Sequence, residues 1–420
     1  MRHYYYFLYT RVSRDLNAVP KDVKTVVFGM FVYMLAWGII DPFFSIFVNS
    51  IVNNYLVTGL LYSLVFLVGI TLSIPVGGLA GRVSKIKYSI VSLLSYPFIG
   101  LLYFSVAFLQ PFHSIIALFF ARLFHSISVL FWIMVEGFIR EKSPKGETSA
   151  VFGLYVTFCN LSYVVAPLLV VPLVLFFSLG TASLHWLFLL LIPFPIISAA
   201  VISRAGDKGK TFAQGVKGVV SEDKIFRKEI SDIREMGFVG IVCLLMTFFM
   251  RSVVAIIAFL IPLYALSLNL GLAEISILFA VISVPYLFSF FFAELADSIG
   301  KIRVISAGFF LLGLALLAIS SISTASIDFF AACFFLGLVL ALMQPAVNGL
   351  VTDITPRVKD GEMTGVQHAT INFSAFATTA LLGALAQLFS LQFPFIVFGC
   401  LLLAMAAVAH SIKGKVVVRI

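Results

Sequence analysis

The sequence of 420 residues has few charged residues and few cysteines. Asp, Glu, Lys and Arg together account for 11% of the residues, whereas 61% are hydrophobic and the mean hydropathy is +1.10. Soluble domains are typically about 25% charged, so this composition excludes an ordinary soluble domain. The four cysteines form no CxxC pair, which argues against a cysteine zinc site and a disulfide framework.

Several motifs of enzymes and ATP-driven proteins are also absent. The chain has no HExxH, no GxSxG and no GxxxxGK[ST] sequence, and its six histidines are scattered over separate segments. These motifs place a metal, a nucleophile or a nucleotide phosphate. We therefore expect a protein that is not an enzyme, binds no metal and uses no cofactor.

Long apolar runs dominate what is present. A helix needs about 20 apolar residues to cross a hydrocarbon core of roughly 30 Å, and only helices or closed barrels satisfy the backbone in lipid. The runs do not alternate in polarity as barrel strands do. We predict twelve spanning helices at roughly 25–48, 57–80, 88–109, 114–138, 149–176, 184–203, 237–264, 272–294, 303–322, 327–350, 363–388 and 393–411.

The positive charges mark one side of the membrane. All of the 28 Lys and Arg residues except Arg122 and Arg251 lie in the N-terminal segment, the central segment, the tail or the loops after spans 2, 4, 8 and 10. The positive-inside rule then places both termini and the central segment in the cytoplasm. We expect a multi-pass protein of the plasma membrane, whose surplus charge reflects topology and not a nucleic-acid partner.

The longest polar segment divides the chain into two equal sets of spans. The predicted parts are an N-terminal cytoplasmic segment (1–24), a six-helix bundle (25–203), a cytoplasmic central loop (204–236), a second six-helix bundle (237–411) and a cytoplasmic tail (412–420).

Two motifs recur at matched places in these halves. LAGRVSKIK at 79–87 parallels LADSIGKIR at 295–303, and VEGFIREKSP at 135–144 parallels VNGLVTDITP at 347–356. The shifts are 216 and 212 residues. This agreement indicates a duplicated six-helix unit.

At these residues the sequence resembles the major facilitator superfamily. The loop signature of that family, G-x-L-a-D-r-x-G-r-k, keeps Asp297 and Gly300 in the second half, whereas Gly81 and Ser84 stand at the matching places in the first. The resemblance implies an all-α fold of two pseudo-symmetric six-helix bundles. It also implies a secondary transporter that moves a small-molecule substrate through the lipid bilayer by alternating access.

The fourth span is loosely similar to the arginine motif of the drug:proton antiporter branch, l-x-x-x-R-x-x-q-G. Leu118 and Arg122 match, and His125 and Ser126 replace the last two residues. The fifth span keeps only Pro167 of the glycine- and proline-containing motif of that branch. The similarity to this branch is therefore only loose. We expect H+ as the coupling ion because ionisable residues lie inside the spans.

Ionisable residues inside the spans identify a candidate central cavity. Arg122, His125 and Glu136 lie within an arc of roughly 80° on the fourth span, and a charge at the bilayer centre costs roughly 2.5 to 3.5 kcal/mol. Asp41, Arg122 and Arg251 are expected at similar depths. The resemblance implies that spans 1, 4, 7 and 10 line the cavity. The predicted cavity residues are Asp41, Arg122, His125, Glu136, Arg251, Tyr33, Trp37 and Gln344.

Three interpretations of these charges remain open. In the first, substrate binding changes the protonation of Asp41, because burial disfavours its charge and Arg122 favours it; His368 and Asn372 are candidate proton-relay residues. In the second, Arg122 and Arg251 bind an anionic metabolite. In the third, the charges only stabilise the fold.

We expect proton-coupled export by a monomer, because aromatic and methionine side chains on the first span suit varied apolar solutes. Proton-coupled uptake or exchange of an anionic metabolite is the alternative. A polytopic membrane enzyme or a transport-inactive receptor is the alternative of another class.

The repeated loops also predict a cytoplasmic latch of ion pairs that changes as the halves move. Glu141 and Asp353, at matched places, are candidate partners for the basic residues of the two loops. The expected latch residues are Arg82, Lys85, Glu141, Asp297, Lys301, Arg303 and Asp353.

Overall fold

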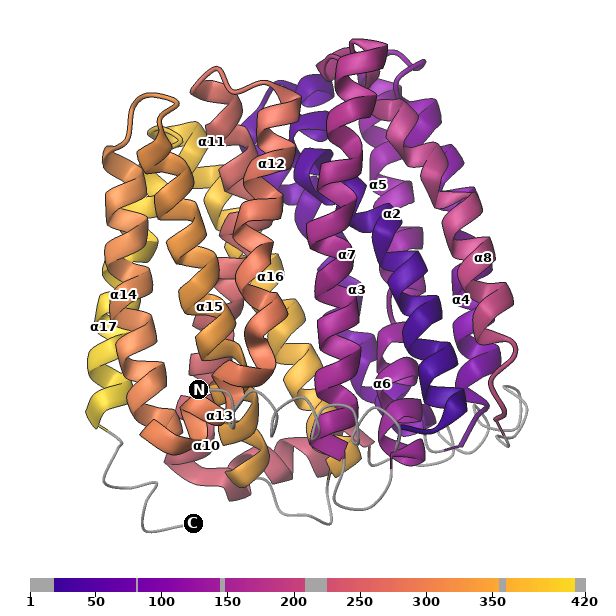
Figure 1. The fold of residues 1–420 in the computed structure, drawn as a ribbon, viewed down its shortest axis with the longest axis vertical. Helices are drawn as coiled ribbons and strands as arrows, with labels where there is room; N and C mark the ends of the chain where they lie inside the picture. The colour runs from indigo at the N-terminus through magenta and orange to yellow at the C-terminus, as the bar shows by residue number, and fades with distance from the viewer. Residues whose placement is uncertain (1–18, 81, 144–147, 208–224, 355–359, 412–420) are drawn as a thin grey trace, which may run out of the picture.

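The computed structural model describes residues 19–80, 82–143, 148–207, 225–354 and 360–411 (Figure 1). The first half contains α2 (Lys21–Val52), α3 (Tyr55–Ala80), α4 (Lys85–Val106), α5 (Pro111–Ser128), α6 (Phe131–Lys142), α7 (Thr148–Phe177), the 3₁₀-helix η1 (Thr181–Leu191) and α8 (Pro193–Ile202).

The second half follows the same plan. It contains α10 (Ile225–Ala255), the π-helical turn η2 (Ile256–Leu260), α11 (Ile261–Ser267), α12 (Leu272–Ser283), the 3₁₀-helix η3 (Val284–Phe288), α13 (Ser289–Ile299), α14 (Lys301–Ser321), α15 (Ile327–Ile354), α16 (Asp360–Leu388) and α17 (Phe393–Ser411).

The predicted all-α membrane fold is confirmed. Within the described residues, eleven helices are long and apolar enough to cross a membrane. The number is twelve when α12, η3 and α13, which are bent by 60° at a short break, are counted as one span. One boundary differs from the sequence prediction, because α10 begins at Ile225 and not near residue 237. Residues 225–236 carry charges of both signs, so a hydropathy pattern finds the membrane-crossing part of this helix and misses its polar extension.

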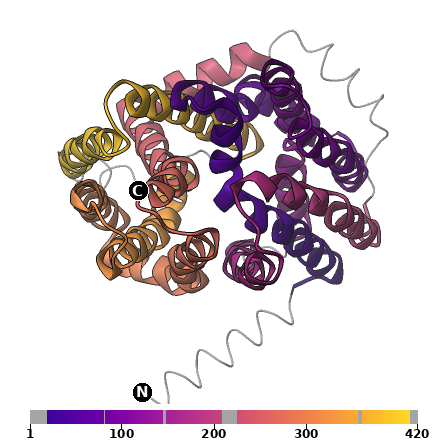
Figure 2. The same ribbon diagram turned by 90° about the horizontal axis from the view of Figure 1, so that it is seen from above.

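The two halves lie side by side, with the first half in indigo and magenta and the second in orange and yellow (Figures 1 and 2). We call the end of the bundle where α2 begins and α8 ends the linker end, and the opposite end the far end. Across the boundary between the halves, α3 packs along α16 and α7 packs along α12.

Glycines allow the close approach of α3 and α16. A Cβ atom added to Gly59 would lie 2.6 Å from the carbonyl oxygen of Thr379, and one added to Gly383 would lie 2.5 Å from that of Tyr55. Small residues bring helix backbones together in membranes in this way. At the same place the Tyr55 N–H donates to Oε1 of Gln387 at 2.8 Å, so this boundary is tight at the far end.

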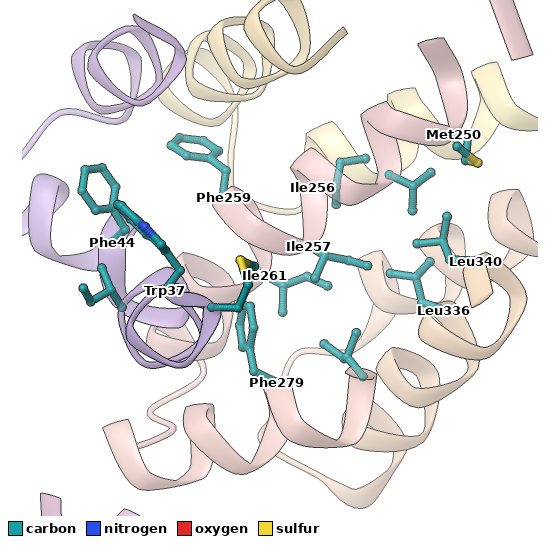
Figure 3. Packing of buried hydrophobic residues seen from close by; sticks show 14 of the residues in the cluster. Trp37, Phe44, Met250, Ile256, Ile257, Phe259, Ile261, Phe279, Leu336 and Leu340 are labelled. Atoms are coloured by element: carbon teal, nitrogen blue, oxygen red, sulfur yellow. The ribbon is translucent and has the colours of Figure 1, made fainter. Parts of the chain in front are cut away.

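Apolar side chains also join the halves toward the far end. Figure 3 shows Trp37 and Phe44 of α2 beside Phe259 and Ile261 of the second half. The ring of Tyr62 in α3 meets that of Phe259 edge-on, with centroids 5.3 Å apart. At these positions the contact between the halves is apolar.

Candidate functional site

The fourth span is broken into two helices, and this break divides its charged residues. Helix α5 ends at Ser128 and α6 begins at Phe131, so Arg122 and His125 lie on one segment and Glu136 on the other. All three contact protein, as the cost of exposing them to lipid requires. Their partners, however, are different.

Arg122 is held inside the first half. Its Nε donates to the carbonyl oxygen of Leu61 at 3.2 Å, and its Nη2 donates to the carbonyl oxygen of Tyr62. The guanidinium also lies 4.5 Å from the ring centroid of Phe44, within the range of a cation–π interaction. Backbone acceptors and aromatic faces therefore satisfy this arginine, and it is only 3% exposed.

His125 belongs to the same buried group. Its ring stacks on Trp37 with centroids 4.6 Å apart, and its Nδ1 lies 3.3 Å from the hydroxyl of Tyr103. Nη1 of Arg122 lies 3.5 Å from the same nitrogen. This arrangement fixes His125 within the packing of the first half.

Asp41 forms its hydrogen bond with a residue that the sequence analysis missed. The hydroxyl of Tyr163, in α7, donates to Oδ2 of Asp41 at 2.7 Å. Arg122 lies near enough to act on the charge of Asp41, but no ion pair within 4.0 Å joins them among the described residues. Asp41 is thus a half-buried carboxyl group whose hydrogen-bond partner is neutral.

Glu136 makes a contact between the two halves. Its Oε2 lies 3.1 Å from Nε2 of His368 in α16, and the two side chains are 22% and 20% exposed. Arg251 in α10 and Arg140 lie within electrostatic range of Glu136. The structure therefore places Arg251 with Glu136 and His368, and Asp41 with Arg122, where the sequence predicted a single layer of three charges.

A polar stripe on α7 lies between these two groups. Tyr155, Cys159 and Tyr163 are spaced four residues apart and therefore lie on one face of the helix. Tyr155 and Cys159 lie within electrostatic range of Glu136, and Tyr163 reaches Asp41. The regular spacing was visible in the sequence, but tyrosine and cysteine in apolar runs are also ordinary packing residues, so the pattern alone did not identify it.

The remaining predicted cavity and relay residues are mostly engaged in packing. The hydroxyl of Tyr33 donates to that of Tyr96 at 2.7 Å inside the first half, and Trp37 stacks on His125. Asn372 donates to Oγ of Ser73 at 3.0 Å across the boundary between α16 and α3. Gln344 is half-buried on α15.

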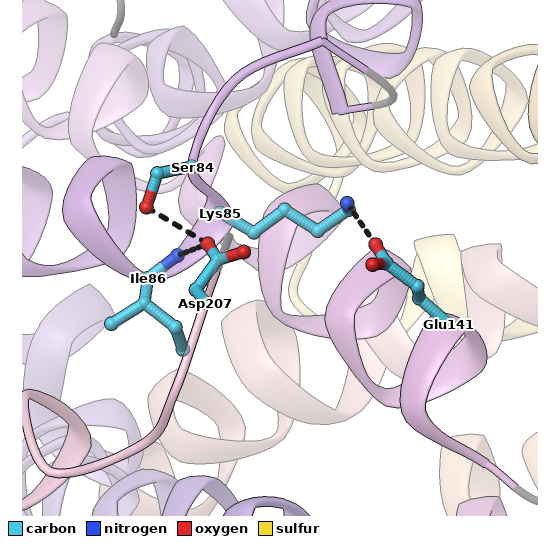
Figure 4. Close-up of polar contacts among 5 residues, drawn as sticks. All are labelled: Ser84, Lys85, Ile86, Glu141 and Asp207. Carbon is cyan, nitrogen blue, oxygen red and sulfur yellow. Dashed lines mark hydrogen bonds and ion pairs between the residues drawn. The ribbon is translucent and has the colours of Figure 1, made fainter. Parts of the chain in front are cut away.

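The linker end contains part of the predicted latch. Nζ of Lys85 lies 2.5 Å from Oε2 of Glu141, as predicted, although both residues belong to the first half (Figure 4). Oδ2 of Asp207 accepts hydrogen bonds from Oγ of Ser84 at 2.8 Å and from the N–H of Ile86 at 3.0 Å. These contacts fasten the end of the sixth span to the start of α4.

In the second half the latch has a different pairing. Lys301 lies 3.4 Å from Asp297, one turn away, and Arg303 donates to the carbonyl oxygen of Ile299 at 3.3 Å. The side chain of Asp353 lies outside the described residues. Arg82 has contacts of its own, and none of the described latch pairs joins the two halves.

Comparison with known proteins extends these observations to the whole chain. The Major Facilitator Superfamily matches residues 26–286 and 243–412. An uncharacterised MFS-type transporter of Methanocaldococcus jannaschii is 22% identical over 379 residues, which cover 89% of this chain and 93% of that protein.

Solved transporter structures share the fold at low sequence identity. A POT family transporter in complex with a thioalcohol-conjugated peptide superposes with a TM-score of 0.73 at 13% identity, over 96% of this chain and 99% of the other. One in complex with 5-aminolevulinic acid gives 0.69 at 14%, over 94% and 97%. The human organic anion transporter MFSD10 gives 0.63 at 14%, over 93% and 100%. Because the family match extends through both halves, the chain belongs to the Major Facilitator Superfamily and is a secondary transporter of that class.

Proposed function

We propose that this protein is a proton-coupled transporter of a small organic solute, and the contact between Glu136 and His368 carries the proposal. The two residues come from opposite halves. A transporter that works by alternating access must change the contacts between its halves in every cycle. A contact made of two titratable groups changes strength when a proton is gained or lost.

The surroundings of this contact suit proton exchange. About one fifth of each side chain is exposed, so protein does not fully enclose the pair. The charged and titratable neighbours of Glu136 are Arg140, Arg251, Tyr155 and Cys159. A bound solute that altered this balance of charge would alter the protonation of the pair.

The direction of transport is proposed on less direct grounds. The aromatic and methionine side chains of the first span favour export. We place this transport in the plasma membrane, with both termini in the cytoplasm. In the structure Tyr33 and Trp37 pack within the first half, so they support the fold more than a cavity. Uptake or exchange of an anionic metabolite is the second candidate, and Arg251 favours it, as argued below.

The test is solute transport by purified protein in proteoliposomes, with a chemically diverse panel and with or without an imposed pH gradient. We expect the gradient to accelerate flux of at least one chemically unchanged solute. Glu136→Gln should lose this acceleration and retain solute exchange, whereas Asp328→Asn, an exposed acidic residue at the far end, should behave as the wild type.

Proton coupling would be contradicted if solute flux through the wild type were the same with and without the pH gradient. It would also be contradicted if the gradient accelerated flux through Glu136→Gln as much as through the wild type. Chemical conversion of the solute would indicate a membrane enzyme, and the absence of flux for every solute would favour a receptor.

A further inference from the structure

Arg251 differs from the other arginine inside the spans. Its Nε is buried and has no hydrogen-bond partner among the described residues, and no carboxylate of the described residues forms an ion pair with it. A buried donor without an acceptor costs about 1 to 3 kcal/mol, and a charged one costs more. In this state of the structure the described residues therefore leave the Nε of Arg251 without an acceptor.

Arg251 lies at the boundary between the two halves. It lies on α10 of the second half, within electrostatic range of Tyr286 on η3 and of Glu136 on α6 of the first half. It therefore faces the boundary between the halves, where alternating access requires the solute to bind. No ion pair within 4.0 Å joins it to Glu136 among the described residues, and Oε2 of that carboxylate lies 3.1 Å from Nε2 of His368.

We infer that Arg251 binds a carboxylate group of the transported solute. This inference rests on the proposed function, because it assigns a substrate class to the same boundary. The planar guanidinium presents its N–H groups as a fork that matches the two oxygens of a carboxylate. The solute would supply the acceptor that the described residues do not provide for Nε.

The charge balance favours a carboxylate over a phosphate ester. Arg251 is permanently charged, whereas the charge of His368 depends on its protonation. The carboxylate of Glu136 would repel a dianion bound at Arg251 about twice as strongly as a monoanion. A monoanion meets less repulsion from Glu136 and is matched by Arg251 alone.

The test is binding to the purified full-length protein, measured by thermal shift and by a competition isotherm. The probes are pairs of similar shape that differ in charge, namely benzoate with benzamide and lactate with lactamide, together with phenyl phosphate. We expect at least one carboxylate to stabilise the wild type while its amide does not. Arg251→Gln should weaken that affinity at least about tenfold, and Arg251→Lys should retain part of it.

Arg303→Gln is the control, because Arg303 is exposed at the linker end and should leave the affinity unchanged. A melting temperature of Arg251→Gln without ligand near that of the wild type will show that the variant is folded. If Arg251→Gln does not fold, the test uses Arg251→Lys alone. A carboxylate affinity of Arg251→Lys equal to that of the wild type would then contradict the inference.

Three further results would overturn the inference. They are equal binding of acid and amide, unchanged carboxylate affinity in Arg251→Gln, and stabilisation by phenyl phosphate in the absence of any carboxylate effect. Binding needs no gradient, so carboxylate binding through Arg251 without gradient-dependent flux would contradict only the proposed proton coupling. Gradient-dependent flux of neutral solutes alone would contradict only this inference.

Discussion

Arg122 and Arg251 are chemically identical, yet their surroundings assign them different tasks. Arg122 donates to two carbonyl oxygens of α3 and lies over aromatic rings. Arg251 has a buried Nε without an acceptor. The first arginine is therefore expected to stabilise the fold, and the second is expected to act on the solute.

This contrast predicts effects of different size on stability. Arg122→Gln should lower the free energy of unfolding by about 2 to 4 kcal/mol, because it removes charge-assisted hydrogen bonds and leaves buried carbonyl groups with fewer donors. Arg251→Gln should change it by less than about 1 kcal/mol, since it removes a guanidinium to which the described residues provide no hydrogen bond and no ion pair within 4.0 Å. Thermal unfolding in detergent measures both, and an Arg122→Gln protein as stable as Arg251→Gln would contradict the assignment.

The sequence identified the ionisable residues inside the spans, but it did not predict their contact partners. Asp41, Arg122, Glu136 and Arg251 are conspicuous because ionisable groups are costly inside a membrane. The contact partners of these residues depend on how each helix is rotated about its axis and on the break between α5 and α6. A hydropathy pattern predicts neither feature. Tyr163, the partner of Asp41, gave no comparable signal.

Among the elements, the two repeated loops show how the halves diverged. Gly300, before α14, has φ +101° and ψ 121°, a conformation that side chains with a Cβ rarely adopt. The matching Ser84, before α4, has φ −66° and accepts a hydrogen bond from the N–H of Lys87 at 3.2 Å. The second half thus keeps the glycine of the family signature for its turn, and the first half replaces it with a helix cap.

Gly300→Ala should therefore destabilise the protein by about 1 to 3 kcal/mol, the usual cost of holding a residue in a sparsely populated backbone region. Gly180→Ala is the matched control, because Gly180 has φ −101° and a Cβ added there would meet no atom within 4 Å. Melting temperatures of the two variants provide the comparison. An equal, small effect at both positions would show that the turn at residue 300 tolerates a side chain.

Element positions were largely predictable, and their irregularities were not. Apolar runs predicted the spans because a membrane demands about 20 such residues. The π-helical turn at 256–260 and the 3₁₀-helices at 181–191 and 284–288 lie inside equally apolar sequence. Packing between neighbouring helices decides such local geometry, and a single-sequence pattern does not encode it.

Across the whole molecule, the two ends of the boundary between the halves differ in chemistry. Toward the far end the halves meet through aromatic and aliphatic side chains and through the backbone contact of α3 with α16. Nearer the linker end they meet through Glu136 and His368. A proton can change the second kind of contact and has no direct effect on the first, so we expect protonation to act on the linker end.

The most direct measurement is the movement of protons that accompanies the solute. Proteoliposomes with a trapped pH-sensitive dye would receive the solute with the largest gradient-dependent flux in the panel. The wild type and His113→Gln, a change at an exposed far-end histidine, should both shift the internal pH as the solute crosses. His368→Gln should still exchange the solute but produce no pH shift. Solute transport without proton movement in the wild type, or full proton movement in His368→Gln, would contradict the account.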